Sequence, residues 1–363
     1  MTKESRIHYE KLIANVFQRF RGVVDLVVLG EYFMAMFFYK YISDYWSEKY
    51  YQYTQLHADK ELVNRKMSRE RFTLNERLLF ETLIRQSNRP HIGELINVAI
   101  GEIEILNAPH FENIFGHLDF NSGYNFGEAS TRGQVLNVFL QCLEGIDLRP
   151  SNPMHEEIID ACIGVIRGYS EINSMNGGEY YTPSDLCSLL VRLVQAKEGD
   201  RIYDPCCGSG GLLVAATRNI KDSQGKQAEN YALYGQERNR QSLAWAKMNM
   251  YLHGLDGFQL AGGDVIAAPA WKEQDQLMKF DIILSDPPFS SDNWGMEYAE
   301  NDPYNRFRWG MPPSSKGDFA FIQHMLSSLN ATGRIGIIIP HGVLFREGRE
   351  LNIRKAIIED NLI

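Results

Sequence analysis

The stretch FDIILSDPPFS, residues 280–290, decides how the second half of the chain folds. Its apolar part, residues 280–285, is typical of a buried β-strand, and two prolines follow almost at once. Proline lacks an amide hydrogen and is excluded from the middle of a sheet, so the strand has to end here in a stiff turn. The turn presents the Asp286 carboxylate, the Pro287 carbonyl and the Phe289 ring, which together suit a planar ligand bearing an amino group. A rigid turn that buries Phe289 in the core is the competing interpretation.

Short apolar segments of the same kind surround this strand. They cover residues 201–204, 231–236, 258–262 and 334–340, and helical patterns separate them. Strands that alternate with helices predict the α/β class, with a mostly parallel sheet and crossover helices. In such a sheet a ligand binds beyond the carboxyl ends of the strands, which is where the Asp286 turn lies.

The first 150 residues have a different pattern, with apolar residues at three- and four-residue spacings, which predicts a helical domain. Its most apolar stretch, residues 23–42, contains three charged side chains, whereas a membrane span needs roughly 20 nearly uncharged residues. We therefore expect a buried helix there. The proline-containing joint DLRPSNPM places the domain boundary near Pro150, which gives domains 1–150 and 151–363.

The composition is that of a globular protein, with 44% hydrophobic and 23% charged residues among 363. A net charge of -9 argues against tight DNA binding by this chain alone, because lysine and arginine supply most of the non-specific affinity for phosphate. The five cysteines are odd in number and lack the spacing of a metal site. We expect reduced thiols, a cytosolic protein and no bound metal.

The turn after the first strand, DPCCGSGG at residues 204–211, is rich in glycine. Glycines here would let backbone amides approach a ligand that a Cβ atom would keep away. Leu213 replaces the last glycine of a dinucleotide fingerprint, and a phosphate loop would need a following Gly-Lys-Ser/Thr. A tight turn without a ligand is the alternative.

Three further positions admit a binding and a structural interpretation. Glu237 after the second strand suits ribose hydroxyls or the N-terminus of the next helix. Asp264 after the third strand suits an adenine amino group or a simple turn. Thr182, Pro183 and Ser184 suit a bound carboxylate or ordinary helix capping, with Pro183 in the first helical position.

Together, the motifs EYYTPSD, DPCCGSGG, GQE, GGD and SDPPF resemble those of S-adenosylmethionine-dependent amino-methyltransferases that act on DNA. Their order is similar to that of the type I modification subunits. Further matches to those subunits are FRGVVD…YKYISDYW, GQERNRQSLAWAKMNMYLHG, NWG and the segment 333–363. The resemblance covers most of the chain and is weakest between about residues 50 and 150.

The resemblance implies a Rossmann-like methyltransferase core in residues 151–363 and an N-terminal helical domain that faces a partner or DNA. It also implies that residues 179–184 hold the methionine part of S-adenosylmethionine, the glycines pack against it, Glu237 binds the ribose and Asp264 lies near the adenine. The cofactor-binding residues would be Glu179, Tyr180, Tyr181, Thr182, Pro183, Ser184, Asp204, Gly208, Ser209, Gly210, Gly211, Glu237 and Asp264. The catalytic turn would be Asp286, Pro287, Pro288 and Phe289, which receive the exocyclic N6 amine of an adenine flipped out of DNA.

The implied partners are double-stranded DNA, a specificity subunit that binds two modification subunits, and a restriction subunit, with no membrane. Two alternatives stay open. Related turns also serve methyltransferases for cytosine or protein glutamine, and the chain would be an idle scaffold subunit if it bound cofactor without turnover.

The sequence departs from the family pattern in two places. Type I subunits usually carry Asn at the position of Asp286, and we expect Asp to serve because both residues present an acceptor oxygen. The family's sheet continues with an antiparallel pair beyond the fifth strand, so we expect a polypeptide truncated at its C-terminus. Between these features, the segment 290–318, with Arg306, Arg308 and Lys316, is expected either to contact the flipped strand or to form a mobile surface loop.

Overall fold

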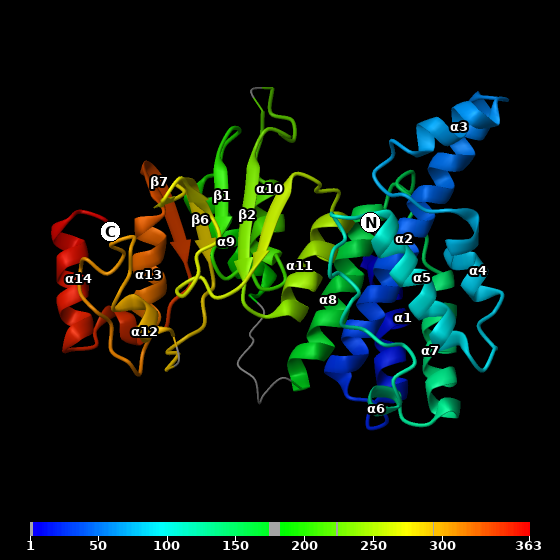
Figure 1. The fold of residues 1–363 in the computed structure, drawn as a ribbon, viewed down its shortest axis with the longest axis horizontal. Helices are drawn as coiled ribbons and strands as arrows, with labels where there is room; N and C mark the ends of the chain where they lie inside the picture. The colour runs from blue at the N-terminus through cyan, green and yellow to red at the C-terminus, as the bar shows by residue number, and fades with distance from the viewer. Residues whose placement is uncertain (1–2, 174–181, 223, 293) are drawn as a thin grey trace. The chain divides into compact units, whose positions relative to one another are not determined.

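The computed structural model describes residues 3–173, 182–222, 224–292 and 294–363 (Figure 1). The chain divides into two compact units, Met1–Gly178 and Glu179–Ile363. Unit 1 is helical in its described residues, and unit 2 alternates strands with helices. The predicted α/β class with a helical N-terminal domain is therefore confirmed.

Unit 1 is built around one long helix, α2, which covers Leu26–Leu56. The other elements are α1 (Lys3–Phe20), α3 (Lys60–Met67), η1 (Glu76–Leu78), α4 (Phe80–Ile84), α5 (Ile92–Leu106), α6 (Gly123–Phe126), α7 (Ala129–Glu144) and α8 (His155–Asn173). Asp25 starts α2 by accepting hydrogen bonds from the amides of Val27 and Val28. Among the described residues, α2 alone is long and apolar enough to cross a membrane, but 83% of its apolar window is buried inside the protein. It is the buried helix that the sequence predicts.

A charged side chain in the middle of α2 is accommodated by local partners. Lys40 is buried, its Nζ pairs with Asp44 one turn later, and it also donates to the Ile146 carbonyl at 3.0 Å. A buried cation needs such partners because the interior cannot solvate it. The charge that interrupts the apolar pattern is thus part of the core of the helical unit.

The last helix of unit 1, α8, packs against α1 and α2. Phe17 of α1 stacks on Tyr169 of α8 with ring centroids 4.8 Å apart. The two units accordingly divide after residue 178. The boundary near Pro150 stays a prediction from the sequence.

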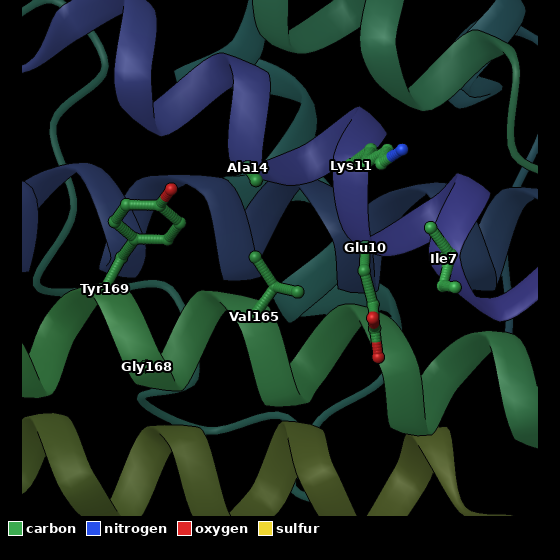
Figure 2. Close-up of a pocket in the computed structure, with 7 residues that line it drawn as sticks. All are labelled: Ile7, Glu10, Lys11, Ala14, Val165, Gly168 and Tyr169. Atoms are coloured by element: carbon green, nitrogen blue, oxygen red, sulfur yellow. The ribbon is translucent and has the colours of Figure 1, made fainter.

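An open groove of about 430 Å³ lies between α1 and α8 (Figure 2). Its lining is Ile7, Glu10, Lys11, Ala14, Val165, Gly168 and Tyr169. These residues belong to unit 1 and to none of the predicted site positions. The groove is therefore a feature of the helical unit alone.

Unit 2 contains a five-stranded sheet in the order β3-β2-β1-β6-β7, and every neighbouring pair is parallel. Its strands are β1 (Arg201–Asp204), β2 (Ala232–Glu237), β3 (Phe258–Gly262), β6 (Phe280–Ser285) and β7 (Leu329–Ile337). A small antiparallel pair, β4 (Lys272–Glu273) and β5 (Gln276–Leu277), was not predicted. The remaining helical elements are α9 (Ser184–Val194), α10 (Gly211–Thr217), α11 (Arg240–Leu252), α12 (Met296–Ala299), α13 (Asp318–Ser327), η2 (His341–Leu344) and α14 (Arg349–Glu359).

Alternate residues of the strands face two different apolar layers. Ile202 packs in the cluster that includes α9, α10 and α11, whereas its neighbour Tyr203 packs in the cluster that includes α13. Helices therefore cover both faces of the sheet, as expected for a doubly wound fold. The strand order reverses between β1 and β6, and ligands bind at such a switch point in open α/β sheets.

The predicted fifth strand, 334–340, differs from the observed β7, which starts and ends earlier. The β6–β7 ladder ends at the pair Ser285–Ile337, followed by a last bond from the Ile338 amide to the Ser285 carbonyl at 3.1 Å. Since β6 turns away into the two prolines after Asp286, β7 has no partner backbone beyond this point. The end of β7 is thus set by the neighbouring turn.

Candidate functional site at the carboxyl ends of the strands

The ends of β1 and β6 are joined directly by their side chains. Ser285 Oγ, the last residue of β6, donates a 2.8 Å hydrogen bond to Oδ1 of Asp204, the last residue of β1. The amide of Cys206 donates to the same oxygen at 3.0 Å. The glycine-rich turn and the Asp286 turn are therefore fixed to each other at the switch point.

Asp204 lies deep in this junction, with only 1% of its surface exposed. Burial raises the pKa of its carboxyl to about 7, the charges of Glu237 and Asp286 add to the rise, and the bonds from Ser285 and Cys206 oppose it. Three acidic side chains thus share one end of the sheet, and the charges of Glu237 and Asp286 give this region a negative potential suited to a cationic ligand.

The pKa of Asp204 predicts a specific pH dependence of stability. Because the folded chain holds this proton more tightly than the unfolded chain, the contribution is complete below about pH 4 and is lost as the pH rises towards 7. Between pH 5 and 8, the free energy of unfolding of the wild type should fall by roughly 2–3 kcal/mol more than that of Asp204→Asn. Urea unfolding at both pH values checks this, and equal pH slopes in the two proteins would contradict it.

The glycine-rich turn brings backbone amides next to Glu237. Gly208 and Gly210 have φ values of 51° and 76°, a left-handed conformation that glycine adopts at little cost. The Gly208 amide donates to Glu237 Oε2 at 2.9 Å, and the Asn239 amide donates to Oε1 at 2.7 Å. Glu237 therefore lies just before α11, as its structural interpretation expects, and its carboxylate also points at the glycine turn.

Two other predicted positions have local partners. Asp264 Oδ1 accepts from the amides of Ile266 and Ala267 at 2.8 and 3.2 Å, as a turn residue does. The backbone carbonyl of Ser209 accepts from Asn249 Nδ2 at 2.9 Å, which ties the glycine turn to α11. Asp264 follows β3 and Ser209 follows β1, so both lie at the same edge of the sheet as Glu237.

The loop before α9 reaches the turn after β6 through Thr182. The Thr182 hydroxyl donates to Asp286 Oδ2 at 2.9 Å. The capping interpretation of Thr182 is wrong, because Pro183 is the N-cap and α9 begins at Ser184. The predicted residues Glu179, Tyr180 and Tyr181 lie outside the described residues.

The turn after β6 is presented as the sequence predicts. Partial burial raises the pKa of Asp286, while the bond from Thr182 opposes this rise. Pro287 is buried and Pro288 is exposed. Phe289 leaves 46% of its surface exposed, so the interpretation that its ring belongs to the core is wrong. The turn at the switch point thus combines a carboxylate that accepts from Thr182 with an accessible aromatic ring three residues later.

Arg306, in contrast, lies inside unit 2 and does not form part of a surface for DNA. Only 1% of its surface is exposed, and its Nε donates to Asp302 at 2.9 Å. Its other nitrogens donate to the carbonyls of Val265 and Ile266 at 3.0 and 2.6 Å. Arg306 therefore anchors its part of the segment to the turn that follows Asp264, and neither expectation for the segment holds at this residue.

The same guanidinium lies beside two further buried side chains. Arg306 Nη1 is 3.3 Å from His324 Nδ1, and the opposite ring nitrogen of His324 is 3.2 Å from the Tyr203 hydroxyl. Burial and the neighbouring Arg306 charge hold the pKa of His324 well below its usual range. The imidazole is therefore neutral and links β1 to the Arg306 segment.

Sequence reasoning missed these contacts because they join residues far apart in the chain. Ser285 belonged to the quoted motif, but only its position at the end of β6 gives its hydroxyl a role. Arg306 carried no signal of burial, since arginine is mostly exposed in proteins. Asp302, four residues before Arg306, was the local signal in the sequence that pointed to an ion pair.

Comparison with known proteins fits this geometry. Residues 155–363 match the family described as N-6 DNA methylase, and residues 9–142 match the HsdM N-terminal domain. The chain belongs to the N-6 DNA methylase family. The N-6 DNA methylase match begins at the first residue of α8, whereas packing assigns that helix to unit 1.

Relatives of this N-6 DNA methylase include type I restriction enzyme subunits from several organisms. The MpnII methylase subunit of Mycoplasma pneumoniae is 26% identical over 99% of this chain and 72% of its own length. The HindI methylase subunit of Haemophilus influenzae is 31% identical over 75% of this chain and 60% of its own length. The MjaVII methylase subunit of Methanocaldococcus jannaschii is 37% identical over 51% of this chain, which spans 32% of that relative.

A solved structure shares the fold of this N-6 DNA methylase throughout. The type I restriction-modification methyltransferase subunit of Streptococcus thermophilus superposes with a TM-score of 0.81 at 26% identity. The match covers 99% of this chain and 80% of that one. The predicted methyltransferase fold is confirmed.

Proposed function

We propose that the chain is the modification subunit of a type I restriction-modification system and methylates the N6 amine of adenine in DNA. The observation that carries this proposal is the turn after β6. There, Asp286 is held by Thr182 and is followed by the exposed ring of Phe289, at the point where the strand order reverses. Membership of the N-6 DNA methylase family supports the same reading.

The strand ends suit S-adenosylmethionine as the cofactor. Glu237 would accept from the ribose hydroxyls, because its carboxylate lies at the end of β2 beside the glycine-rich turn. Gly208 and Gly210 keep Cβ atoms out of the turn that would face the cofactor, and Asp264 would lie near the adenine. Bound S-adenosylmethionine supplies an electrophilic methyl group on a positively charged sulfur, and the acidic strand ends favour that charge.

The Asp286 turn would make the target amine more nucleophilic. The lone pair of an exocyclic adenine nitrogen is delocalised into the ring. Asp286 and the Pro287 carbonyl would accept its two N–H bonds, which favours a pyramidal nitrogen with its lone pair aimed at the methyl group. Thr182 occupies Oδ2 of Asp286, so Oδ1 is the oxygen that would accept from the amine. After methyl transfer the positively charged nitrogen would release one proton to solvent, so Asp286 would need only to accept hydrogen bonds as an ionised carboxylate.

Phe289 would hold the target base after it leaves the duplex. A base inside a duplex is out of reach of this turn, so the enzyme must flip it outwards, and aromatic rings stabilise flipped bases by stacking. The accessible ring of Phe289 directly after the two prolines suits this task. The stiff turn keeps acceptor and ring at a constant separation.

We also propose that recognition of the DNA sequence belongs to partners. The chain has a net charge of -9, which disfavours tight DNA binding by this subunit alone. A specificity subunit carrying two copies of this chain would supply it, with a restriction subunit added for cleavage, and the N-terminal helical domain would face the partner or DNA. The five cysteines are free thiols, in agreement with a cytoplasmic location.

Methyl transfer from labelled S-adenosylmethionine tests this proposal. The chain would be assayed alone and co-expressed with its specificity subunit, on adenine-containing duplexes, on duplexes without adenine, and on protein. We expect label only in adenine-containing DNA and a strong increase with the partner. Label confined to cytosine or protein would replace the proposed substrate, and cofactor binding without turnover in the complex would indicate a scaffold subunit.

A further inference from the structure

A buried charged cluster lies directly behind the Asp286 turn and outside the positions assigned to cofactor and base. Asp318 at the start of α13 and Glu350 in α14 have side chains only 3% and 4% exposed. Arg346, 19% exposed, pairs with both, at 2.7 Å to Asp318 and 3.1 Å to Glu350. Buried charges are costly unless they are paired and hydrogen-bonded, so the members of this cluster need close partners.

The cluster forms hydrogen bonds with Ser290, the residue that follows Phe289. The Ser290 amide donates to Asp318 Oδ1 at 2.8 Å, while Arg346 Nη1 donates to the other oxygen of the same carboxylate. Arg346 Nη2 also donates to the Ser290 hydroxyl at 3.2 Å. Backbone and side chain of Ser290 are thus held by one ion pair, between Asp318 at the start of α13 and Arg346 in the loop before α14.

Ser290 adopts a conformation that needs such support. Its φ is 49°, in the left-handed region that residues other than glycine seldom occupy. Pro287 and Pro288 already have φ fixed by their rings, so the freedom left in the turn is concentrated at Phe289 and Ser290. The bond from the Gly317 amide to the Ser291 carbonyl, at 2.9 Å, secures the next residue as well.

We propose that Asp318 and Arg346 are positioning residues for the methyl-transfer reaction. They fix Ser290 and thereby the direction of the Phe289 ring, so that the flipped adenine is held with its amine at Asp286. Among the described residues, the hydrogen bonds of these two side chains go to Ser290, Glu350 and each other rather than to the proposed cofactor positions. The inference rests on the proposed function and extends it to a residue pair that the motifs do not include.

Replacement of Asp318 separates positioning from simple stability. In the complex with the specificity subunit, Asp318→Ala should lower kcat by about 100-fold, since misplacement of a reacting group by about 1 Å can cost that much. The Kd of S-adenosylmethionine, measured by calorimetry, should stay within a few-fold. Asp318→Asn keeps an acceptor oxygen for the Ser290 amide and should recover kcat to within about tenfold of wild type.

Glu350→Gln is the matched control, because Glu350 contacts Arg346 but has no bond to Ser290 among those of the cluster. Its kcat should stay close to that of wild type. If Asp318→Ala does not fold, Ser290→Gly serves as the test. Glycine can adopt the left-handed conformation of residue 290 but lacks the hydroxyl that Arg346 contacts, so the turn becomes more flexible. The kcat should fall about tenfold while the Kd of the cofactor stays unchanged.

An unchanged kcat in Asp318→Ala, or in Ser290→Gly where that variant is used, would overturn the inference while leaving the proposed function intact. Equal losses of kcat and cofactor affinity in Asp318→Ala and Asp318→Asn would overturn it too, since they indicate a general structural role. A wild-type complex that transfers no methyl group to DNA would contradict the proposed function, and the inference with it.

Discussion

Asp286→Ala should reduce kcat for methyl transfer by about 10²- to 10³-fold, the usual effect of removing one preorganised hydrogen-bonding group from a reacting centre. The variant loses the oxygen that would accept from the adenine amine, and the Thr182 hydroxyl loses its partner. Cofactor affinity should change by no more than a few-fold, because Glu237 and the glycine turn keep their contacts. Initial rates with labelled cofactor, together with a binding titration, measure the two effects separately.

Asp286→Asn is the matched control for this variant. Its amide oxygen still accepts a hydrogen bond. We expect kcat within about tenfold of wild type. Wild-type rates in Asp286→Ala, or equal losses in both variants, would refute the role given to the acceptor oxygen.

Arg306→Met should destabilise the protein by about 3–5 kcal/mol, because it leaves a buried carboxylate without its counterion. The paired Asp302 side chain is 4% exposed. The carbonyls of Val265 and Ile266 would lose their donors as well. Urea unfolding, followed by circular dichroism, measures the shift in the free energy of unfolding.

Arg308→Met provides the comparison, two residues further along the same segment. Arg308 is exposed, and its guanidinium lies over the Trp309 ring at 3.7 Å. Its replacement should change stability by less than about 1 kcal/mol, in the range for surface substitutions and exposed cation–π contacts. If the two variants lose similar amounts, the buried anchor assigned to Arg306 is wrong.

The sheet could be predicted from the sequence where local signals mark both ends of a strand. Residues 201–204, 258–262 and 280–285 were predicted with the bounds observed for β1, β3 and β6. Glycine, proline or charged residues flank each of them. The limits of β7 could not be read this way, since they depend on where β6 turns off at Asp286, a property of the neighbouring strand.

The residues of the candidate site, like the strands, were predictable only where the signal was local in the sequence. Asp204, Glu237 and Asp286 were predicted from their positions after apolar strands, because parallel topology brings strand ends to one edge. Three features were not predictable: the hydrogen bond from Thr182 to Asp286, the burial of Arg306, and the hydrogen bond from the Ser290 amide to Asp318. Each depends on which residues the fold brings together across large sequence separations, and the same side chains are mostly solvent-exposed in other proteins.

The most direct test of the account is the identity of the methylated base. DNA would be incubated with S-adenosylmethionine and the complex of this chain with its specificity subunit, then digested to nucleosides and analysed by mass spectrometry. We expect N6-methyladenine with the wild type and with Asp286→Asn, and almost none with Asp286→Ala. Methylation found only on cytosine, or as much N6-methyladenine from Asp286→Ala as from the wild type, would contradict it.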